Sequence, residues 1–232
     1  KVFFFLVSFL CIFITLVAIN KYNTRTRLAI ILFISSTLIP STFYLLKQAP
    51  AVAFSSLAIA MFLNKKMIYC IILTFVAILF HESAIILIPL YIILIGAKNT
   101  WIRVIEYALF IVVLFFFREI VSIILPIVNT VNYIGSQTVG FEESVLGSQG
   151  ISNLLTIIKG SPLYIITVYA FLNRTRLKKR IYNYDKFLII CCVGSICVLL
   201  SSIYYWMFRF AMYCYLPAYV FASLLHQNIK LA

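Results

Sequence analysis

Charge is the property that this sequence has least of. Charged residues make up 11% of the 232 residues, and six of them are acidic. A soluble globular protein is about a quarter charged and about half apolar, whereas this chain is 64% hydrophobic with a mean hydropathy of +1.10. A soluble protein of this length has no interior large enough to bury so much apolar surface. The scarcity of charge therefore excludes a soluble domain and predicts a membrane protein.

The sequence also lacks the short motifs that hold nucleotides and metals. It contains neither a P-loop nor a G-x-G-x-x-G motif, which argues against a site for ATP or a nucleotide sugar. It has no DxD-like pair of acids, and its six cysteines lie inside apolar runs without metal-ligand spacing. We therefore expect no metal and no cofactor, and we interpret the cysteines as small buried hydrophobes.

What the chain has instead is a series of continuous apolar runs. Because these runs do not alternate with polar residues, they predict transmembrane helices rather than a barrel. We expect an all-α, polytopic transmembrane helix bundle with about nine membrane segments, at 2–19, 28–46, 49–63, 67–80, 83–96, 104–125, 157–172, 187–206 and 210–225. The segments 49–63 and 67–80 are short enough to be half-length or re-entrant helices.

We expect the whole chain, 1–232, to form one transmembrane domain, since no internal repeat is visible. The long connection 129–156 is rich in Gly, Ser, Asn and Gln and is typical of a loop. Lys1 directly precedes an apolar run without a polar leader. This beginning suggests a piece of a longer protein that lacks its N-terminal region.

The basic residues indicate the orientation. The net charge of +13 comes from short clusters between apolar runs, which suit topology signals and contact with membrane lipid rather than nucleic acid. If the segments alternate sides, one side collects fourteen of the nineteen basic residues: Lys21, Arg25, Arg27, Lys65, Lys66, Lys98, Arg103, Arg174, Arg176, Lys178, Lys179, Arg180, Lys186 and Lys230. The positive-inside rule makes this side cytoplasmic and places the loop 129–156 outside.

Isolated polar residues gather on the predicted outer side. His81 interrupts an apolar stretch in the triplet HES, where Ser83 could cap the next helix and Glu82 would occupy its first turn. A plain interfacial turn is the alternative. Histidine is the side chain best suited to move a proton near neutral pH, and ionisable groups at membrane depth usually mark a functional cavity.

Several cations accompany this histidine. Lys47, followed by Gln48, could snorkel to the headgroups, and Arg209 could belong to an interfacial aromatic belt. Arg118 could be neutralised by its neighbour Glu119 or could line the cavity. Together, outer-side cations and a histidine suit an anionic, lipid-linked substrate with a pyrophosphate leaving group. The proton of an attacking sugar hydroxyl would then pass to His81 or to a loop carboxylate, Glu142 or Glu143.

The stretch from LLKQAPAVAF to FHESAIILIPLYIIL resembles the EpsG branch of the Wzy-type polysaccharide polymerases. The similarity lies in a basic residue followed by Gln48 and a small-residue helix, a short basic turn at Lys65 and Lys66, and a helix ending in Ala-x-x-x-His-x-Ser-Ala. The later MFRFAMYCYLPAYVF is similar to the family's Arg-x-x-x-Tyr helix through Arg209 and Tyr213.

The resemblance implies a metal-independent glycosyltransferase of GT-C-like architecture in the inner (cytoplasmic) membrane. It would polymerise repeat units linked to undecaprenyl pyrophosphate into an O-antigen or exopolysaccharide at the outer face. His81, Glu142 and Glu143 would be catalytic, and Lys47, Arg118 and Arg209 would bind the pyrophosphate, with Gln48, Ser83 and Tyr213 in support. The expected partner is the lipid-linked glycan, and a chain-length regulator and a flippase are further candidates.

Two other functions remain open from the residues alone. A flippase or other transporter would show internal repeats and polar residues near mid-membrane. A membrane acyltransferase would use one intramembrane histidine together with a second polar residue near a cytoplasmic thioester donor.

Overall fold

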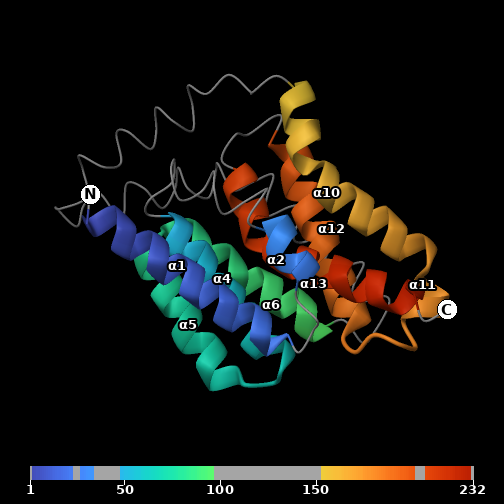
Figure 1. The fold of residues 1–232 in the computed structure, drawn as a ribbon, viewed down its shortest axis with the longest axis horizontal. Helices are drawn as coiled ribbons and strands as arrows, with labels where there is room; N and C mark the ends of the chain where they lie inside the picture. Colours follow the sequence, from blue (N-terminus) through green and yellow to red (C-terminus); the bar gives the residue numbers. More distant parts are fainter. Residues whose placement is uncertain (1, 23–26, 34–47, 97–152, 202–206, 231–232) are drawn as a thin grey trace.

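The computed structural model describes residues 2–22, 27–33, 48–96, 153–201 and 207–230, and every regular element within them is a helix (Figure 1). The all-helical fold class is therefore confirmed over this part of the chain. The elements are α1 (Val2–Lys21), α2 (Arg27–Phe33), α4 (Gln48–Leu63), α5 (Met67–Phe80), the 3-10 helix η2 (Glu82–Ile86), α6 (Leu87–Gly96), α10 (Asn153–Leu172), α11 (Arg174–Leu177), α12 (Tyr184–Leu200) and α13 (Met207–Lys230).

The helices begin and end where polar residues interrupt the apolar runs. Each predicted segment coincides at least in part with a helix, except 104–125, which lies outside the described residues. The helix α5 spans the predicted residues, and α4 differs from its prediction by one residue. At about 1.5 Å per residue, these helices of 16 and 14 residues are shorter than the hydrocarbon core of roughly 30 Å.

The turn between α4 and α5 has the geometry of a Schellman motif. The N–H of Lys66 donates to the carbonyl of Met61 at 2.9 Å, and the N–H of Lys65 donates to that of Phe62 at 3.0 Å. Lys65 adopts the left-handed conformation, with φ of 61°, at the position that glycine usually takes. The sharp turn makes α4 and α5 antiparallel neighbours.

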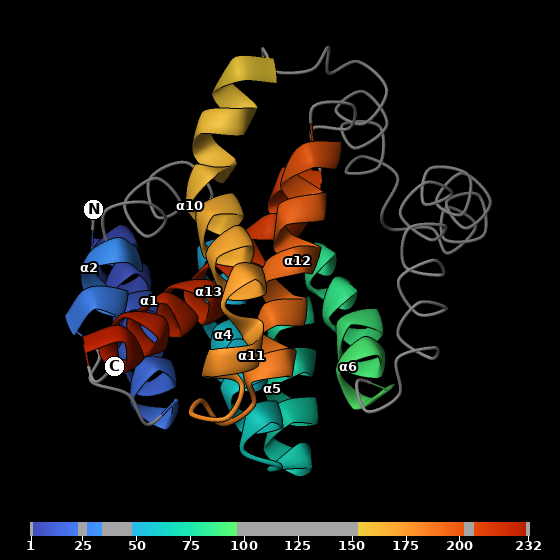
Figure 2. The ribbon, with the colours of Figure 1, turned by 90° about the vertical axis from the view of Figure 1, so that its right-hand side faces the viewer.

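The helix α13 lies at the centre of the bundle. It contacts α12, α10, α2, α4 and η2, and it lies between the group α1, α4, α5 and α6 and the pair α10 and α12 (Figures 1 and 2). One turn after another of α13 is buried, including Tyr213, Leu216, Val220 and Phe221. This helix therefore connects the two halves of the fold.

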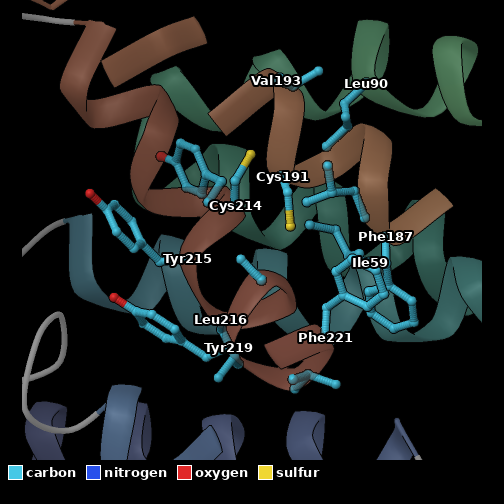
Figure 3. Close-up of a cluster of buried hydrophobic side chains, with 14 of the residues drawn as sticks. Ile59, Leu90, Phe187, Cys191, Val193, Cys214, Tyr215, Leu216, Tyr219 and Phe221 are labelled. Atoms are coloured by element: carbon cyan, nitrogen blue, oxygen red, sulfur yellow. The ribbon is translucent and has the colours of Figure 1, made fainter. Parts of the chain in front are cut away.

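Aromatic stacking and close helix approach hold α12 against α13 (Figure 3). The rings of Phe187 and Phe221 stack with centroids 5.3 Å apart, and Tyr184 meets Phe221 edge-on at 5.2 Å. Gly194 allows the backbones to approach, because a Cβ at this position would lie 2.8 Å from the Cβ of Cys214. All six cysteines are free thiols and five of them are buried, as expected for small core residues.

The outward faces of the peripheral helices are strongly apolar. Large side chains such as Phe9, Ile68, Phe75 and Phe171 are 60% or more exposed. Among the described helices, one stretch, Met207–Asn228, is both long and apolar enough to cross a bilayer, and most of it is buried within the protein. Apolar patches of this extent on the surface are typical of contact with lipid or with another protein.

The structure corrects three details of the sequence prediction. The segment expected as a helix from 83 to 96 is divided into η2 and α6. Ser83 was expected to cap this helix, but His81 occupies the N-cap position and its side chain accepts the capping hydrogen bond. The helix α10 begins at Asn153, inside the predicted loop 129–156, whose earlier part lies outside the described residues.

Candidate active site

His81 lies at the junction between α5 and η2, where the chain changes direction. Its backbone is extended, with φ of −156° and ψ of 121°, and its N–H still donates to the carbonyl of Ala77 at 3.0 Å. Its ring turns back over the next residues, so that Nδ1 accepts the backbone N–H of Ser83 at 3.2 Å. The half-buried imidazole is thus held in one orientation by the turn that it caps.

Ser83 joins this histidine to α13. The Ser83 hydroxyl lies 2.7 Å from Nδ1 of His81 and 2.7 Å from the hydroxyl of Tyr213, which is 130 residues away in sequence. Tyr213 is fully buried, so its hydroxyl needs such a partner. The three side chains form one hydrogen-bonded chain.

The backbone contact determines the direction of this chain of hydrogen bonds. Because the N–H of Ser83 can only donate, Nδ1 of His81 must present its lone pair, and the neutral ring carries its proton on Nε2. The Ser83 hydroxyl then donates to Nδ1, and the Tyr213 hydroxyl donates to Ser83 Oγ. The second lone pair of Ser83 Oγ can still accept another hydroxyl.

Arg209 lies one helical turn before Tyr213 on α13. Its guanidinium is close enough to interact electrostatically with the Tyr213 hydroxyl, and the residue is half-buried. A cation therefore lies beside the hydrogen-bonded chain of His81, Ser83 and Tyr213.

Gln48 attaches the start of α4 to the same region. Its Nε2 donates to the backbone carbonyl of Arg209 at 3.2 Å, and the side chain is 1% exposed. Its Oε1 is buried without a hydrogen-bond partner among the described residues. A buried amide oxygen of this kind can accept a hydrogen bond from a ligand, since leaving it unpaired is costly.

The structure thus brings together five of the predicted site residues, which come from three separate parts of the chain: Gln48, His81, Ser83, Arg209 and Tyr213. The other four, Lys47, Arg118, Glu142 and Glu143, lie outside the described residues. Glu82 is exposed. In the described residues, hydrogen-bond donors, one imidazole and one cation converge at a single end of the bundle.

The clustered basic residues lie at the other end. The helices α4 and α13 begin beside the site and run away from it, whereas α5 runs toward it. At the far ends, the amide of Asn64 donates to the carbonyl of Lys21 at 2.7 Å, and that of Asn183 donates to the carbonyl of Leu63 at 3.1 Å. Because these contacts join the α1 terminus, the α4–α5 turn and the α11–α12 connection, three basic clusters that the sequence assigned to one side meet at one end.

The contact between Ser83 and Tyr213 was not foreseen. Both residues were expected near the site, but the sequence offered only the spacing His-x-Ser and the later Arg-x-x-x-Tyr. Neither pattern indicates which hydroxyl would meet which.

Comparison with known proteins identifies a family for this chain. No curated protein and no solved structure matches the chain. The profile of the EpsG family matches residues 1–231, nearly the full length. The chain therefore belongs to the EpsG family and is a membrane protein of polysaccharide biosynthesis.

Proposed function

We propose that this protein is a polysaccharide polymerase. It transfers a growing glycan from undecaprenyl pyrophosphate to a sugar hydroxyl of the next lipid-linked repeat unit, at the outer face of the cytoplasmic membrane. The observation that carries the proposal is the hydrogen-bonded chain His81–Ser83–Tyr213 beside Arg209, in a chain of the EpsG family.

In the proposed step, the attacking sugar hydroxyl donates its hydrogen bond to the second lone pair of Ser83 Oγ. As the sugar oxygen forms its bond to the anomeric carbon, its proton passes to Ser83 Oγ and the Ser83 proton passes to Nδ1 of His81. The bond between the anomeric carbon and the pyrophosphate oxygen breaks, and the pyrophosphate leaves with the electron pair. Tyr213 keeps the Ser83 hydroxyl oriented through its own hydrogen bond.

The leaving pyrophosphate concentrates negative charge, which nearby cations stabilise as it develops. Arg209 takes this role in the described site, and we assign Lys47 and Arg118 to the same task. Gln48 holds the backbone at Arg209 and offers Oε1 to a substrate hydroxyl. Glu142 and Glu143, in the predicted outer loop, are the alternative proton acceptors.

The proposal includes a location and an architecture. The protein would have about nine membrane segments in a GT-C-like arrangement in the inner membrane. The His81 end would face outward and the basic end would face the cytoplasm. The apolar outer faces of α1, α5 and α10 support contact with lipid. The substrate is the lipid-linked glycan, and no metal takes part in the proposed step.

The experiment compares glycan ladders from a deletion strain complemented with single variants. His81→Ala should reduce polymerisation by about 10²- to 10⁴-fold, the usual contribution of general acid–base catalysis, and Arg209→Ala should shorten or abolish the ladder. His226→Ala is the matched control, because this second histidine is exposed near the far end of α13. Arg176→Ala, at the basic end, is the control for the lost arginine.

The products distinguish the alternatives. A polymerase defect leaves a single repeat unit on the cell surface, whereas total loss of surface glycan would favour a flippase. Normal ladders from both site variants, at normal protein levels in the membrane, would overturn the site assignment.

A further inference from the structure

A second polar region lies at the basic end of the bundle, opposite the candidate active site. A cavity of about 890 Å³ opens between the α4–α5 turn and the connection from α11 to α12. Its lining includes five basic residues: Lys65, Lys178, Lys179, Arg180 and Lys186. None of the proposed catalytic residues contributes to it.

The cavity has an excess of positive charge. Among its described lining residues, Asp185 is the sole acid, and it is already bound to Lys178 at 2.7 Å and to Arg174 at 3.1 Å. No acid is therefore left within this lining to balance Lys65, Lys179 and Arg180. Basic pockets between helices at the cytoplasmic surface are suited to lipid headgroups that carry phosphate.

The floor of the cavity is apolar. Phe62, Leu94 and Ile181 are buried there, whereas Met67 and Ile95 lie at its edge and are 43% and 62% exposed. A charged rim above an apolar floor matches an amphiphile better than a fully soluble anion. The acyl or glycerol portion can cover the floor while the phosphate meets the lysines.

The two walls of the cavity are tied together before any ligand binds. The Asn183 amide on one wall donates at 3.1 Å to the carbonyl of Leu63, the chain neighbour of Phe62 on the other wall. Lys65 and Asn183, which both line the cavity, adopt the left-handed conformation, with φ of 61° and 60°. This conformation is unfavourable for lysine and tolerated by asparagine, so the surrounding contacts hold Lys65, and with it the rim, in a defined shape.

We infer that this cavity binds a phosphate group at the basic end of the bundle. The observations favour the headgroup of an anionic phospholipid as its source, and free inorganic phosphate is the other source of the same chemistry. The inference stands on the charge, volume and lining of the cavity and does not depend on the proposed polymerase activity.

The test uses the purified full-length chain in a neutral detergent, with phosphatidylglycerol, phosphatidylcholine or inorganic phosphate added separately. Phosphatidylglycerol should raise the melting temperature, and the other two should not. The triple variant Lys65→Gln, Lys179→Gln, Arg180→Gln should bind phosphatidylglycerol roughly 100-fold more weakly, since each cation near an anionic lipid contributes about fivefold.

A control triple variant removes the same number and type of charges from residues outside the cavity. Lys21→Gln, Lys66→Gln and Arg176→Gln also delete two lysines and one arginine, from exposed positions at the same end that do not line the cavity. This variant should keep the wild-type response to phosphatidylglycerol. Single substitutions, Lys179→Gln against Lys66→Gln, repeat the comparison if the triple variants fold poorly.

Equal loss of response in the site and control variants would overturn the inference, because it would reveal a general charge effect. An equal shift with phosphatidylcholine would overturn it as well. A shift with inorganic phosphate that the site triple abolishes would support a phosphate site and reject the lipid as its source.

Discussion

At the scale of single residues, the proposed proton transfer from the substrate to His81 depends on Ser83. Its hydroxyl is the link between Nδ1 of His81 and the Tyr213 hydroxyl, at 2.7 Å from each. We call the proposed proton path from the substrate through Ser83 to His81 the relay. We expect Ser83→Ala to lower polymerisation by about 10²-fold or more, because this variant removes the hydroxyl through which the proton passes. The measurement is the glycan ladder of the complemented deletion strain, normalised to protein level.

The conservative variant separates a chemical from a structural role. Ser83→Thr keeps a hydroxyl and should retain a large part of the activity, whereas Tyr213→Phe removes only the orienting bond and should have a smaller effect than Ser83→Ala. Equal activity of Ser83→Ala and wild type would contradict the relay and leave His81 to act alone.

The sequence could predict the members of this site but not their pairing. His81 and Arg209 were recognisable because ionisable side chains inside apolar runs are costly and usually functional. The contact of Ser83 with Tyr213 depends on how η2 packs against α13 across 130 residues. No local pattern encodes such a contact, and the role of His81 as a cap also depends on its rotamer.

At the scale of elements, the close approach of α12 and α13 depends on Gly194. A Cβ at this position would lie 2.8 Å from the Cβ of Cys214 and 3.2 Å from Cδ1 of Leu163. Because a Cβ cannot rotate away, Gly194→Ala should separate the helices and destabilise the protein by about 1–3 kcal/mol, the usual cost of overpacking. Thermal unfolding of the purified protein in detergent measures this cost.

Cys192→Ala is the matched control for this substitution, since Cys192 lies two residues earlier on the same helix at a half-buried position. It should change the melting temperature little. An equal loss of melting temperature in the two variants would contradict a specific contact at Gly194 and would indicate that α12 is sensitive to any substitution.

A second prediction at this scale concerns pH and the ion pairs between α11 and α12. Asp185 precedes the predicted membrane segment 187–206. Burial raises the pKa of its carboxyl, but the hydrogen bonds and charges of Lys178 and Arg174 outweigh burial and hold the pKa below its ordinary value. The ion pairs therefore stabilise the fold above the ordinary pKa, and this contribution is lost as the pH falls through the lowered one.

Asp185→Asn tests this dependence. The partners are partly exposed, at 39% and 51%, so the variant should lose less than about 1 kcal/mol at neutral pH. Its difference from wild type should stay constant between about pH 5 and 8 and shrink at more acidic pH. A difference that grows on acidification would contradict the assigned direction, and Glu82→Gln serves as an exposed control.

Helix boundaries followed closely from the sequence where polar residues interrupt apolar runs. The positions of α4 and α5 show this, because Lys65 and Lys66 separate two long apolar stretches. The break between η2 and α6 was missed, although Pro89, which has no N–H to donate, favours a helix that begins just before it, as α6 does at Leu87. The extension of α13 to Lys230 was missed because its last turns contain His226, Gln227 and Asn228.

At the scale of the whole molecule, the two ends of the bundle differ in chemistry. One end gathers His81, Ser83, Tyr213 and Arg209, and the other gathers the basic clusters and the cavity that they line. The helices α4, α5 and α13 each run between the two ends, and exposed apolar side chains cover α1, α5 and α10 between them. A bilayer around this middle zone would separate two aqueous compartments.

Cysteine labelling tests which end faces outward. Glu142→Cys, in the predicted outer loop, should react with a membrane-impermeant maleimide on intact cells, whereas Lys178→Cys should react only after permeabilisation. Because Lys178 is exposed, burial within the protein would not explain a failure of Lys178→Cys to react. Five native cysteines are buried, which keeps background labelling low. The positive-inside rule places the basic end at the cytoplasmic face. The reverse labelling pattern would contradict this orientation and would put the proposed glycosyl transfer at the cytoplasmic face instead.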